Sequence, residues 1–364
     1  MTKVAASHRE TERGAMRTGW APQTPSEQDN PVGSTERRLA AVASRVAAID
    51  AARFCLSFLV VLLHALPTAK SAPLGVTLVA TACRIAVPFF FIATGYFMPR
   101  YGGLTSSLIL RPVRRLLPVF AFWMTLYVAL SHAFGLEGTQ LRISTLLSGG
   151  AAYHLWFLPA LGFALVAVGL GRALLGAWLT GIACAVLAGL ALANGAYHDL
   201  LHLPGTSTRG GLLVAPMFVF IGTVLADRAV GAGWPWRGAA VLVAHGMLVG
   251  EEWLVFRLSD APVITSHDFM GSTFVFGAAV FILVQGIPDA GVPRALAYLG
   301  KVSLGIYAVH LLVLWFCRPL MGSVELLGTS DISHAIATAA VVFGISTGFS
   351  LFLGCTRRLR PLVA

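Results

Sequence analysis

The chain has 364 residues, of which 57% are hydrophobic and 12% charged, and its mean hydropathy is +0.78. A soluble domain carries roughly 25% charged residues, so this composition excludes a soluble globule and favours a protein whose apolar surface faces membrane lipids. The net charge of +10 could indicate a nucleic-acid partner. The basic residues, however, are spread over many short segments and form no groove-sized patch, which excludes nucleic acid.

The first 48 residues differ in composition from the rest of the chain. They are rich in Arg, Glu, Ser, Thr, Pro and Gly and contain no sustained apolar stretch. Such a composition predicts a disordered cytoplasmic tail over 1–48. The missing apolar core also argues against a cleavable signal peptide.

Ten apolar runs follow the tail. Each is close to the ~20 residues that a helix needs to cross the hydrocarbon core of a bilayer. The sequence therefore predicts an all-α polytopic membrane bundle of about ten transmembrane helices over 49–357, followed by a short cytoplasmic C-terminus at 358–364. The runs lie near 50–68, 76–98, 116–134, 153–171, 174–193, 209–227, 238–256, 268–286, 299–317 and 334–354.

The distribution of Lys and Arg predicts the orientation of these helices. Most of the 26 basic residues lie in the tail and in alternate loops, counted with the N-terminus inside. This positive-inside bias predicts that both termini are cytoplasmic. The five cysteines form no C-x-x-C pair and lie in or beside apolar runs, so we interpret them as packing residues and expect no metal site.

The first apolar run carries three ionisable residues, which are costly inside a membrane and are therefore functional candidates. Asp50 and Arg53 lie at its predicted cytoplasmic end, and His64 lies eleven positions after Arg53. At 1.5 Å per residue their backbones are roughly 16 Å apart, and eleven steps are close to three turns, so both point to one side. This arrangement suits the wall of a pore or tunnel. Alternatively, Arg53 reaches the interface and His64 is only hydrogen-bonded in the bundle.

The second run and the segment after it are also rich in arginine. Arg84 lies in the predicted outer third of this run, before Pro88, which lacks a backbone N–H. The following loop carries Arg111, Arg114 and Arg115. These arginines act as a positive-inside signal alone, or they also bind the phosphates of a nucleotide-bearing donor in the cytoplasm.

Two later runs add polar candidates. His154 lies where the fourth run begins, between aromatic residues typical of an interfacial belt, and it is either solvated there or lines a site. Ser303, Tyr307 and His310 recur in the ninth run at steps of four and three, so they share one helix face. Such a stripe faces the protein interior, either as a site or as structural hydrogen bonding.

Taken together, these segments resemble acyltransferase family 3, the polytopic bacterial membrane O-acyltransferases. The resemblance covers residues from about 48 to about 355 and rests on five stretches in order. Thr94 is a mild departure, because many members have Ser before the glycine. The stretches are Asp50, Arg53 and His64; Pro88 with Phe89-Phe90-Phe91 and Thr94-Gly95-Tyr96; Arg111 and Arg114; His154 to Leu158; and Ser303 to His310.

The resemblance implies an activity that composition does not predict. The family moves an acyl group, usually acetyl from cytoplasmic acetyl-CoA, to a hydroxyl of a glycan or another acceptor. By this resemblance we expect a multi-pass protein of the bacterial inner membrane that uses acetyl-CoA, a saccharide or lipid-linked glycan acceptor and no metal.

The implied roles of the residues follow the family's motifs. Arg111, Arg114 and Arg115 would bind the CoA phosphates, and Arg53 with Asp50 would lie at the donor entrance. His64 would work near the thioester as a general base or as a covalent acyl carrier, a choice that the sequence leaves open. Substrate contacts or carbonyl polarisation would come from a further set: Arg84, His154, Ser303, Tyr307 and His310.

The residues also suit two alternative functions. A secondary transporter of a saccharide or small molecule would also use a buried His and Arg, in a proton relay. A different acyl donor such as succinyl-CoA, or a non-glycan acceptor, would suit the same motifs. Binding of CoA separates the enzyme from the transporter, which has no use for that ligand.

Overall fold

The computed structural model describes residues 31–66, 74–98, 107–134, 152–203, 211–227, 234–259, 267–288, 291–322 and 332–363. Contacts divide the chain into two units, Met1–Ala43 and Ser44–Ala364. Of the predicted tail, residues 1–30 lie outside the described residues. Residues 31–48, which we expected to be disordered, belong to helix α1 (Pro31–Ala65), and this expectation was wrong. Residues 31–48 contain five Ala and three Arg, which favour helix even without an apolar stripe.

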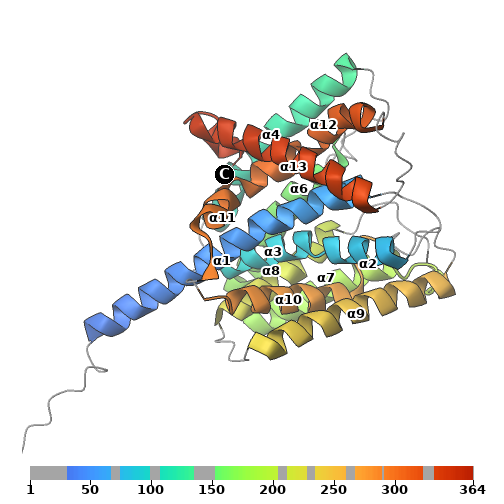
Figure 1. The fold of residues 1–364 in the computed structure, drawn as a ribbon. Coiled ribbons are helices and arrows are strands. Elements are labelled where there is room, and N and C mark those ends of the chain that lie inside the picture. Colours follow the sequence, from blue (N-terminus) through green and yellow to red (C-terminus); the bar gives the residue numbers. More distant parts are fainter. Residues whose placement is uncertain are drawn as a thin grey trace, which may run out of the picture. The chain divides into compact units, whose positions relative to one another are not determined.

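The second unit is built from helices, and the described residues contain no strand (Figure 1). After α1 the elements are α2 (Leu74–Cys83), α3 (Ala86–Tyr96), α4 (Ser107–Ala133), the 3-10 helix η2 (Tyr153–Trp156), α6 (Phe157–Leu174), α7 (Gly176–Asn194), α8 (Gly211–Asp227), α9 (Trp234–Leu258), α10 (Gly271–Gln285), α11 (Arg294–Leu299), η4 (Gly300–Val302), α12 (Ser303–Gly322), α13 (Ile332–Cys355) and η6 (Arg360–Leu362).

The predicted membrane bundle is confirmed. Eight helical segments among the described residues are long and apolar enough to cross a membrane. The other two predicted runs correspond to α8 and α10, which are apolar but have only 17 and 15 residues. Each of the ten predicted runs therefore overlaps at least one helix among the described residues. The orientation of the termini stays a prediction.

The second predicted run is two helices rather than one. The helical backbone is interrupted by a turn at Arg84 and Ile85, between α2 and α3. Pro88 is the third residue of α3, where its missing N–H would have no partner within the helix. The proline is therefore tolerated by starting a new helix before it, and the interruption leaves Arg84 at a helix junction.

Helix α4 corrects a second expectation. The segment with Arg111, Arg114 and Arg115 was predicted to be a loop, but α4 begins at Ser107 and includes all three. Arg111 and Arg115 are four residues apart, so they share a face of α4.

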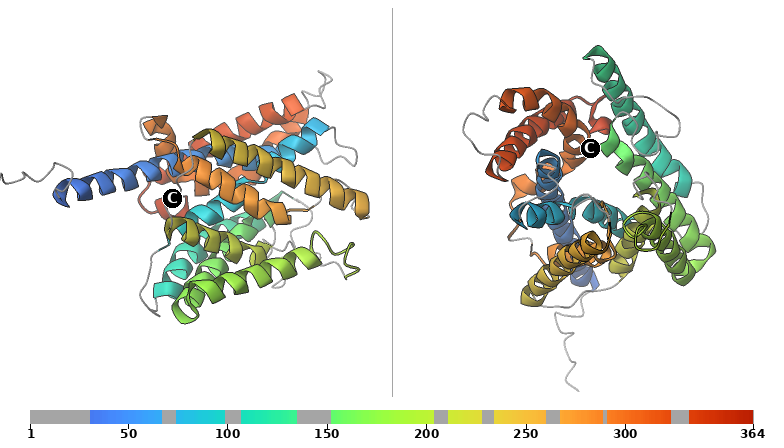
Figure 2. Two further views of the ribbon diagram at one scale, coloured as in Figure 1. Left: turned by 90° about the horizontal axis from the view of Figure 1, so that it is seen from below. Right: turned by 90° about the vertical axis from the view of Figure 1, so that its right-hand side faces the viewer.

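Helices α3 and α8 pack against each other at the centre of the second unit, and α6, α7 and α10 surround them (Figures 1 and 2). Their backbones approach most closely at Gly95 and Gly222. A Cβ on Gly95 would lie 2.0 Å from the carbonyl oxygen of Val219, and one on Gly222 would lie 2.1 Å from that of Ile92. Only glycine fits both positions, so this pair fixes the distance between the two helices.

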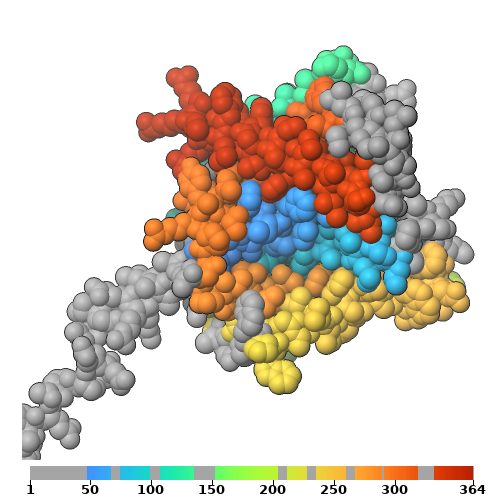
Figure 3. Space-filling view, in the orientation of Figure 1, coloured from blue at the N-terminus to red at the C-terminus, as the bar shows by residue number. Residues whose placement is uncertain are grey.

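The chain after α13 turns back into the bundle. Val363 is buried, and its carbonyl accepts a hydrogen bond of 3.1 Å from the backbone N–H of Gly305. The indole N–H of Trp123 donates to the carbonyl of Leu362 at 3.1 Å. These contacts join α4, α12 and η6. Beside them, α13 covers one flank of α1, which reaches the surface as a narrow strip (Figure 3).

Candidate active site

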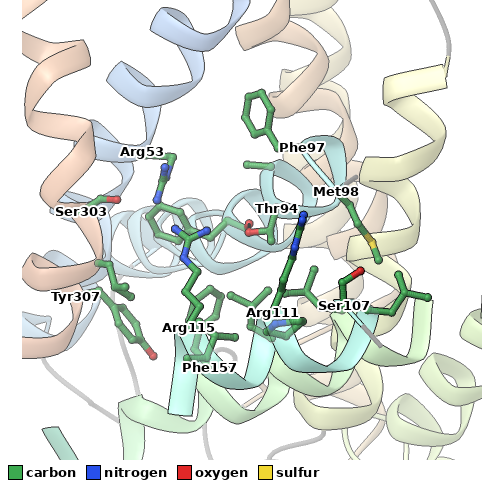
Figure 4. Close-up of a pocket in the computed structure, with 18 residues that line it drawn as sticks. Arg53, Thr94, Phe97, Met98, Ser107, Arg111, Arg115, Phe157, Ser303 and Tyr307 are labelled. Carbon is green, nitrogen blue, oxygen red and sulfur yellow. Dashed lines mark hydrogen bonds between the residues drawn. The ribbon is translucent and has the colours of Figure 1, made fainter. Parts of the chain in front are cut away.

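A pocket of about 550 Å³ opens between α1, α3, α4, α6 and α12. Its lining is mixed. Arginines approach from two helices, and aromatic and aliphatic side chains cover the rest. The lining includes Arg53, Thr94, Arg111, Arg115, Phe157, Ser303 and Tyr307 (Figure 4).

The arginines of α1 and α4 converge on this pocket. Arg53 enters from α1, while Arg111 and Arg115 point in from the opposite wall (Figure 4). Asp50 accepts a hydrogen bond from Arg53 at 3.3 Å, which neutralises one of the three cations in part and orients it. Arg114 does not line the pocket. The pocket is therefore a basic site able to bind a multiply charged anion.

Two residues of α12 extend the pocket toward the interior. Ser303 and Tyr307 are buried and both line it, one helical turn apart, as the polar stripe predicted. The ring of Phe157 packs on Tyr307 at 5.3 Å between centroids, and the hydroxyl of Tyr307 donates to the carbonyl of His154. The inner wall of the pocket is thus aromatic.

Three histidines from three different elements meet behind this wall. The ring of His310 lies 5.2 Å from that of His64 and 5.0 Å from that of His154. Tyr307 lies between the pocket and this cluster, because its ring is 5.6 Å from His154 and 6.0 Å from His310. The cluster of His64, His154 and His310 is called the histidine cluster below.

Hydrogen bonds orient the members of the histidine cluster. Nδ1 of His64 lies 3.2 Å from the hydroxyl of Tyr153. Nε2 of His154 lies 3.2 Å from the carbonyl oxygen of Ala308, and Nδ1 of His310 lies 2.6 Å from that of Tyr307. His154 and His310 are buried, whereas His64 is partly exposed. A reactive group could therefore reach His64 more easily than the other two.

A tyrosine of α4 interrupts the backbone hydrogen bonding of α12 beside His310. The hydroxyl of Tyr127 donates to the carbonyl of Ala308 at 2.9 Å and accepts from the N–H of Leu312 at 3.1 Å. It thus stands where the helical hydrogen bond from Leu312 to Ala308 would form. A side chain inserted into the ladder in this way bends or opens a helix locally. Sequence reasoning missed Tyr127, because only its tertiary position gives it this role.

Arg84 belongs to neither the pocket nor the histidine cluster. At the α2–α3 junction its guanidinium lies 3.8 Å from the carboxylate of Asp268. It also interacts electrostatically with Glu252 of α9, which is buried and whose carboxylate oxygens have no hydrogen-bond partner among the described residues. Arg84 and Glu252 therefore form a second charged group, separate from the pocket.

The adjacent Glu251 has a structural role. Its carboxylate accepts from the backbone N–H groups of Gly271 at 3.2 Å and Ser272 at 2.8 Å, and from the hydroxyl of Ser272. It therefore caps the N-terminus of α10 from a neighbouring helix. The hydroxyl of Tyr197 donates a hydrogen bond to Glu251. Burial raises the pKa of Tyr197 most, and the hydrogen bond to this carboxylate raises it further.

No group of three or more His, Cys, Asp or Glu side chains that could hold a metal ion occurs in the described part of the chain. What the site offers is a basic pocket, an aromatic wall and imidazoles behind it. Imidazoles of this kind can accept protons or act as nucleophiles, and arginines can bind phosphates.

Comparison with known proteins identifies a family whose model matches most of the chain. The model of a family described as an acyltransferase domain matches residues 46–354, which covers the pocket and the histidine cluster. An amino-acid racemase of Enterococcus faecalis is 32% identical over 126 residues, covering 32% of this chain and 18% of that protein. A serine/alanine racemase of Enterococcus gallinarum is 26% identical over 287 residues, covering 72% of this chain and 40% of that protein. The chain thus spans less than half the length of either relative, and no solved structure matches it.

Proposed function

Because the chain belongs to the acyltransferase family whose domain it matches over residues 46–354, we propose that this membrane acyltransferase moves acetyl from acetyl-CoA to a hydroxyl of a saccharide. The observation that carries the proposal is the basic pocket, which leads through an aromatic wall to the histidine cluster. We further propose that it works in the bacterial inner membrane, on a surface or exported polysaccharide or on its lipid-linked unit.

The lining of the pocket supports a donor with several phosphates and an apolar arm. Arg53, Arg111 and Arg115 offer guanidinium groups on two opposite walls, and such groups bind phosphate oxygens in pairs. The aromatic and aliphatic lining suits the pantetheine arm and the acetyl group. In this proposal Arg115 replaces Arg114 as the partner of Arg111, because Arg114 does not line the pocket.

His64 then carries the chemistry. Of the three clustered histidines it is the partly exposed one, and Tyr153 orients its ring from Nδ1. Its imidazole takes the proton of the acceptor hydroxyl, or it carries the acetyl group covalently between donor and acceptor. In either mechanism the acetyl group must pass Tyr307, which lies between the pocket and the histidine cluster.

A second acceptor class is the hydroxyl of an amino acid. The favouring observation is that both similar proteins named above are amino-acid racemases, one of them named for serine and alanine. A serine hydroxyl has the same nucleophilic chemistry as a sugar hydroxyl. The two acceptor classes therefore differ in the product and not in the use of the donor.

The first test is donor binding to the full-length protein in lipid nanodiscs. Replacing both Arg111 and Arg115 with Ala should weaken acetyl-CoA binding at least tenfold, because each charge-assisted phosphate contact contributes about 1.5–3 kcal/mol. As a control, Arg114→Ala is compared with Arg111→Ala and with Arg115→Ala, because each single variant removes one charge from the same helix. Arg114 lies outside the pocket lining, so its loss should change binding much less. Equal losses in the three single variants would favour general electrostatic attraction over this site.

The second test is transfer. Membranes containing the protein receive acetyl-CoA labelled in the acetyl group, and the label is then sought in extracted glycan and in amino acids. His64→Ala should abolish labelling without changing membrane insertion. Retained labelling in that variant would show that transfer does not require His64. A protein that binds no CoA and transfers no label would instead support the secondary transporter, for which a buried His and Arg also suffice.

A further inference from the structure

One ring nitrogen in the histidine cluster has no assigned purpose. Nε2 of His310 is buried and has no hydrogen-bond partner among the described residues, and the side chain as a whole has no exposed surface. Unpartnered buried polar atoms are rare in native proteins and call for an explanation, such as a catalytic role. The same residue lies at the centre of the histidine cluster, in contact with His64.

The tautomer of His310 follows from its other nitrogen. Nδ1 lies 2.6 Å from the carbonyl oxygen of Tyr307, and a carbonyl oxygen can only accept a hydrogen bond. Nδ1 therefore carries the hydrogen, and Nε2 of the neutral ring carries a lone pair. This tautomer cannot donate from Nε2, so the expectation that His310 polarises a carbonyl oxygen does not fit. Nε2 is instead a proton acceptor.

His64 and His310 differ in ways that suit two different tasks. His64 is partly exposed, whereas His310 is buried and held by the Tyr307 carbonyl on the part of α12 that Tyr127 opens. Their rings are stacked with centroids 5.2 Å apart and an interplanar angle of 25°. An acetyl group on one ring would therefore lie within reach of a hydroxyl that contacts the other.

We propose that His64 is the nucleophile that carries the acetyl group and that His310 is the general base that activates the acceptor hydroxyl. This division of labour rests on the proposed acetyl transfer and deepens it. It assigns the covalent mechanism, which the residue types alone leave open, and it makes His310 a catalytic residue, since Nε2 would contact the reacting hydroxyl.

The two half-reactions balance. In the first, Nε2 of His64 attacks the carbonyl carbon of the thioester, the C–S bond breaks, and CoA leaves as a thiolate. In the second, the acceptor oxygen forms the ester bond to that carbon, and the C–N bond breaks with its electron pair returning to His64. The hydroxyl proton passes to Nε2 of His310, which later releases it, and the CoA thiolate takes up one proton.

The test separates acylation from deacylation without a known acceptor. The full-length protein in nanodiscs is mixed with acetyl-CoA labelled in the acetyl group, CoA release is timed, and label on the peptide with His64 is measured. Excess donor is then removed, and loss of the protein-bound label is followed in water and in hydroxylamine. Water needs a base to attack, whereas hydroxylamine is nucleophilic enough to attack unaided.

The informative variant is His310→Asn. The Asn amide can still donate to the Tyr307 carbonyl from the position of Nδ1, but it removes the lone pair at Nε2. The control is His334→Asn in α13, because His334 also has an Nε2 without a partner among the described residues and lies outside the proposed site. The control reports on the structural cost of the same substitution.

In His310→Asn we expect an unchanged burst of CoA release, label that stays on His64 at least 100-fold longer in water, and normal release in hydroxylamine. Loss of the burst in this variant but not in His334→Asn, or unchanged decay in water, would overturn the role of His310. If the wild type transfers acetyl but His64 never carries label, the proposed covalent acetyl-His64 intermediate is refuted. A wild type that releases no CoA at all would instead refute the proposed function itself.

Discussion

The contact between α3 and α8 offers the most direct test of the fold around the site. Gly222→Ala would place a Cβ 2.1 Å from the carbonyl oxygen of Ile92 and 2.8 Å from the backbone nitrogen of Tyr96. These neighbours are backbone atoms of a helix, so they cannot rotate away as a flexible side chain would. Relief requires that the two helices separate by about 1 Å, and a close-packed interior does not absorb such a change cheaply.

The size of the effect follows from this geometry. Overpacking a dense interior costs about 1–3 kcal/mol, and rigid backbone neighbours place Gly222→Ala at the upper end of that range. The change also improves helix propensity by up to about 1 kcal/mol, so we expect a net loss of about 2 kcal/mol in the free energy of unfolding. Helix association in lipid relies on packing, so no gain in apolar burial offsets the loss.

The matched control is Gly189→Ala in α7. A Cβ there meets no atom within 4 Å, so this variant gains propensity without a clash and should be as stable as the wild type or slightly more stable. Unfolding is measured in detergent micelles by titration with SDS, followed by circular dichroism. Because Ala93 and Thr94 of α3 line the pocket, Gly222→Ala should also weaken acetyl-CoA binding. Equal unfolding curves for the two variants would refute the close approach of the helices.

Three further outcomes are expected. Tyr153→Phe keeps the ring beside His64 but removes the hydroxyl at Nδ1, so acetyl transfer should fall about fivefold, as expected for one hydrogen bond of about 1 kcal/mol, without loss of stability. Glu251→Ala removes the cap of α10 and should lower the free energy of unfolding by about 1–2 kcal/mol in the SDS titration. The pKa of His267 is lowered, first by burial and then by repulsion from Arg84 and His198, so the folded state binds its proton less readily than the unfolded state. The contribution of His267 to the free energy of unfolding should therefore be fully present above about pH 6.5 and be lost as the pH falls below it. The variant His267→Asn should flatten this pH dependence.

Each of these has a result that would contradict it. Full transfer activity in Tyr153→Phe would mean that the hydroxyl does not orient His64. An Ala variant of Glu251 as stable as the wild type would show that solvent caps α10 equally well. If His267→Asn leaves the pH dependence unchanged, other groups cause the acid lability. Gly246→Ala in α9, where a Cβ also meets nothing within 4 Å, serves as a neutral control for the stability measurements.

The sequence alone determined the class of the fold. Few charged residues and ten apolar runs near 20 residues leave only a membrane helical bundle, because lipid requires every backbone polar group to be satisfied within its own helix. The same local rules misplaced the residues at which some helices begin. The arginines near residue 111 read as a loop, because charge is rare inside membrane helices, yet α4 simply begins before them.

The candidate residues were found one by one, but their grouping was not. Spacing along α12 correctly put Ser303 and Tyr307 on one face, since local helical geometry sets that relation. It could not indicate that His310 stacks on His64, which lies 246 positions earlier, or that Arg115 rather than Arg114 faces the pocket with Arg53. Those relations depend on how distant helices pack.

Tertiary structure also decided which polar residues are structural and which remain to be explained. Glu251 and Glu252 are neighbours of the same type in sequence, yet one caps α10 and the other lies buried with oxygens that find no hydrogen bond in the described part of the chain. The three histidines differ in the same way, because packing alone determines which ring nitrogen meets a carbonyl and which keeps its lone pair. Residue type supplied the chemistry, and the contacts between helices assigned it.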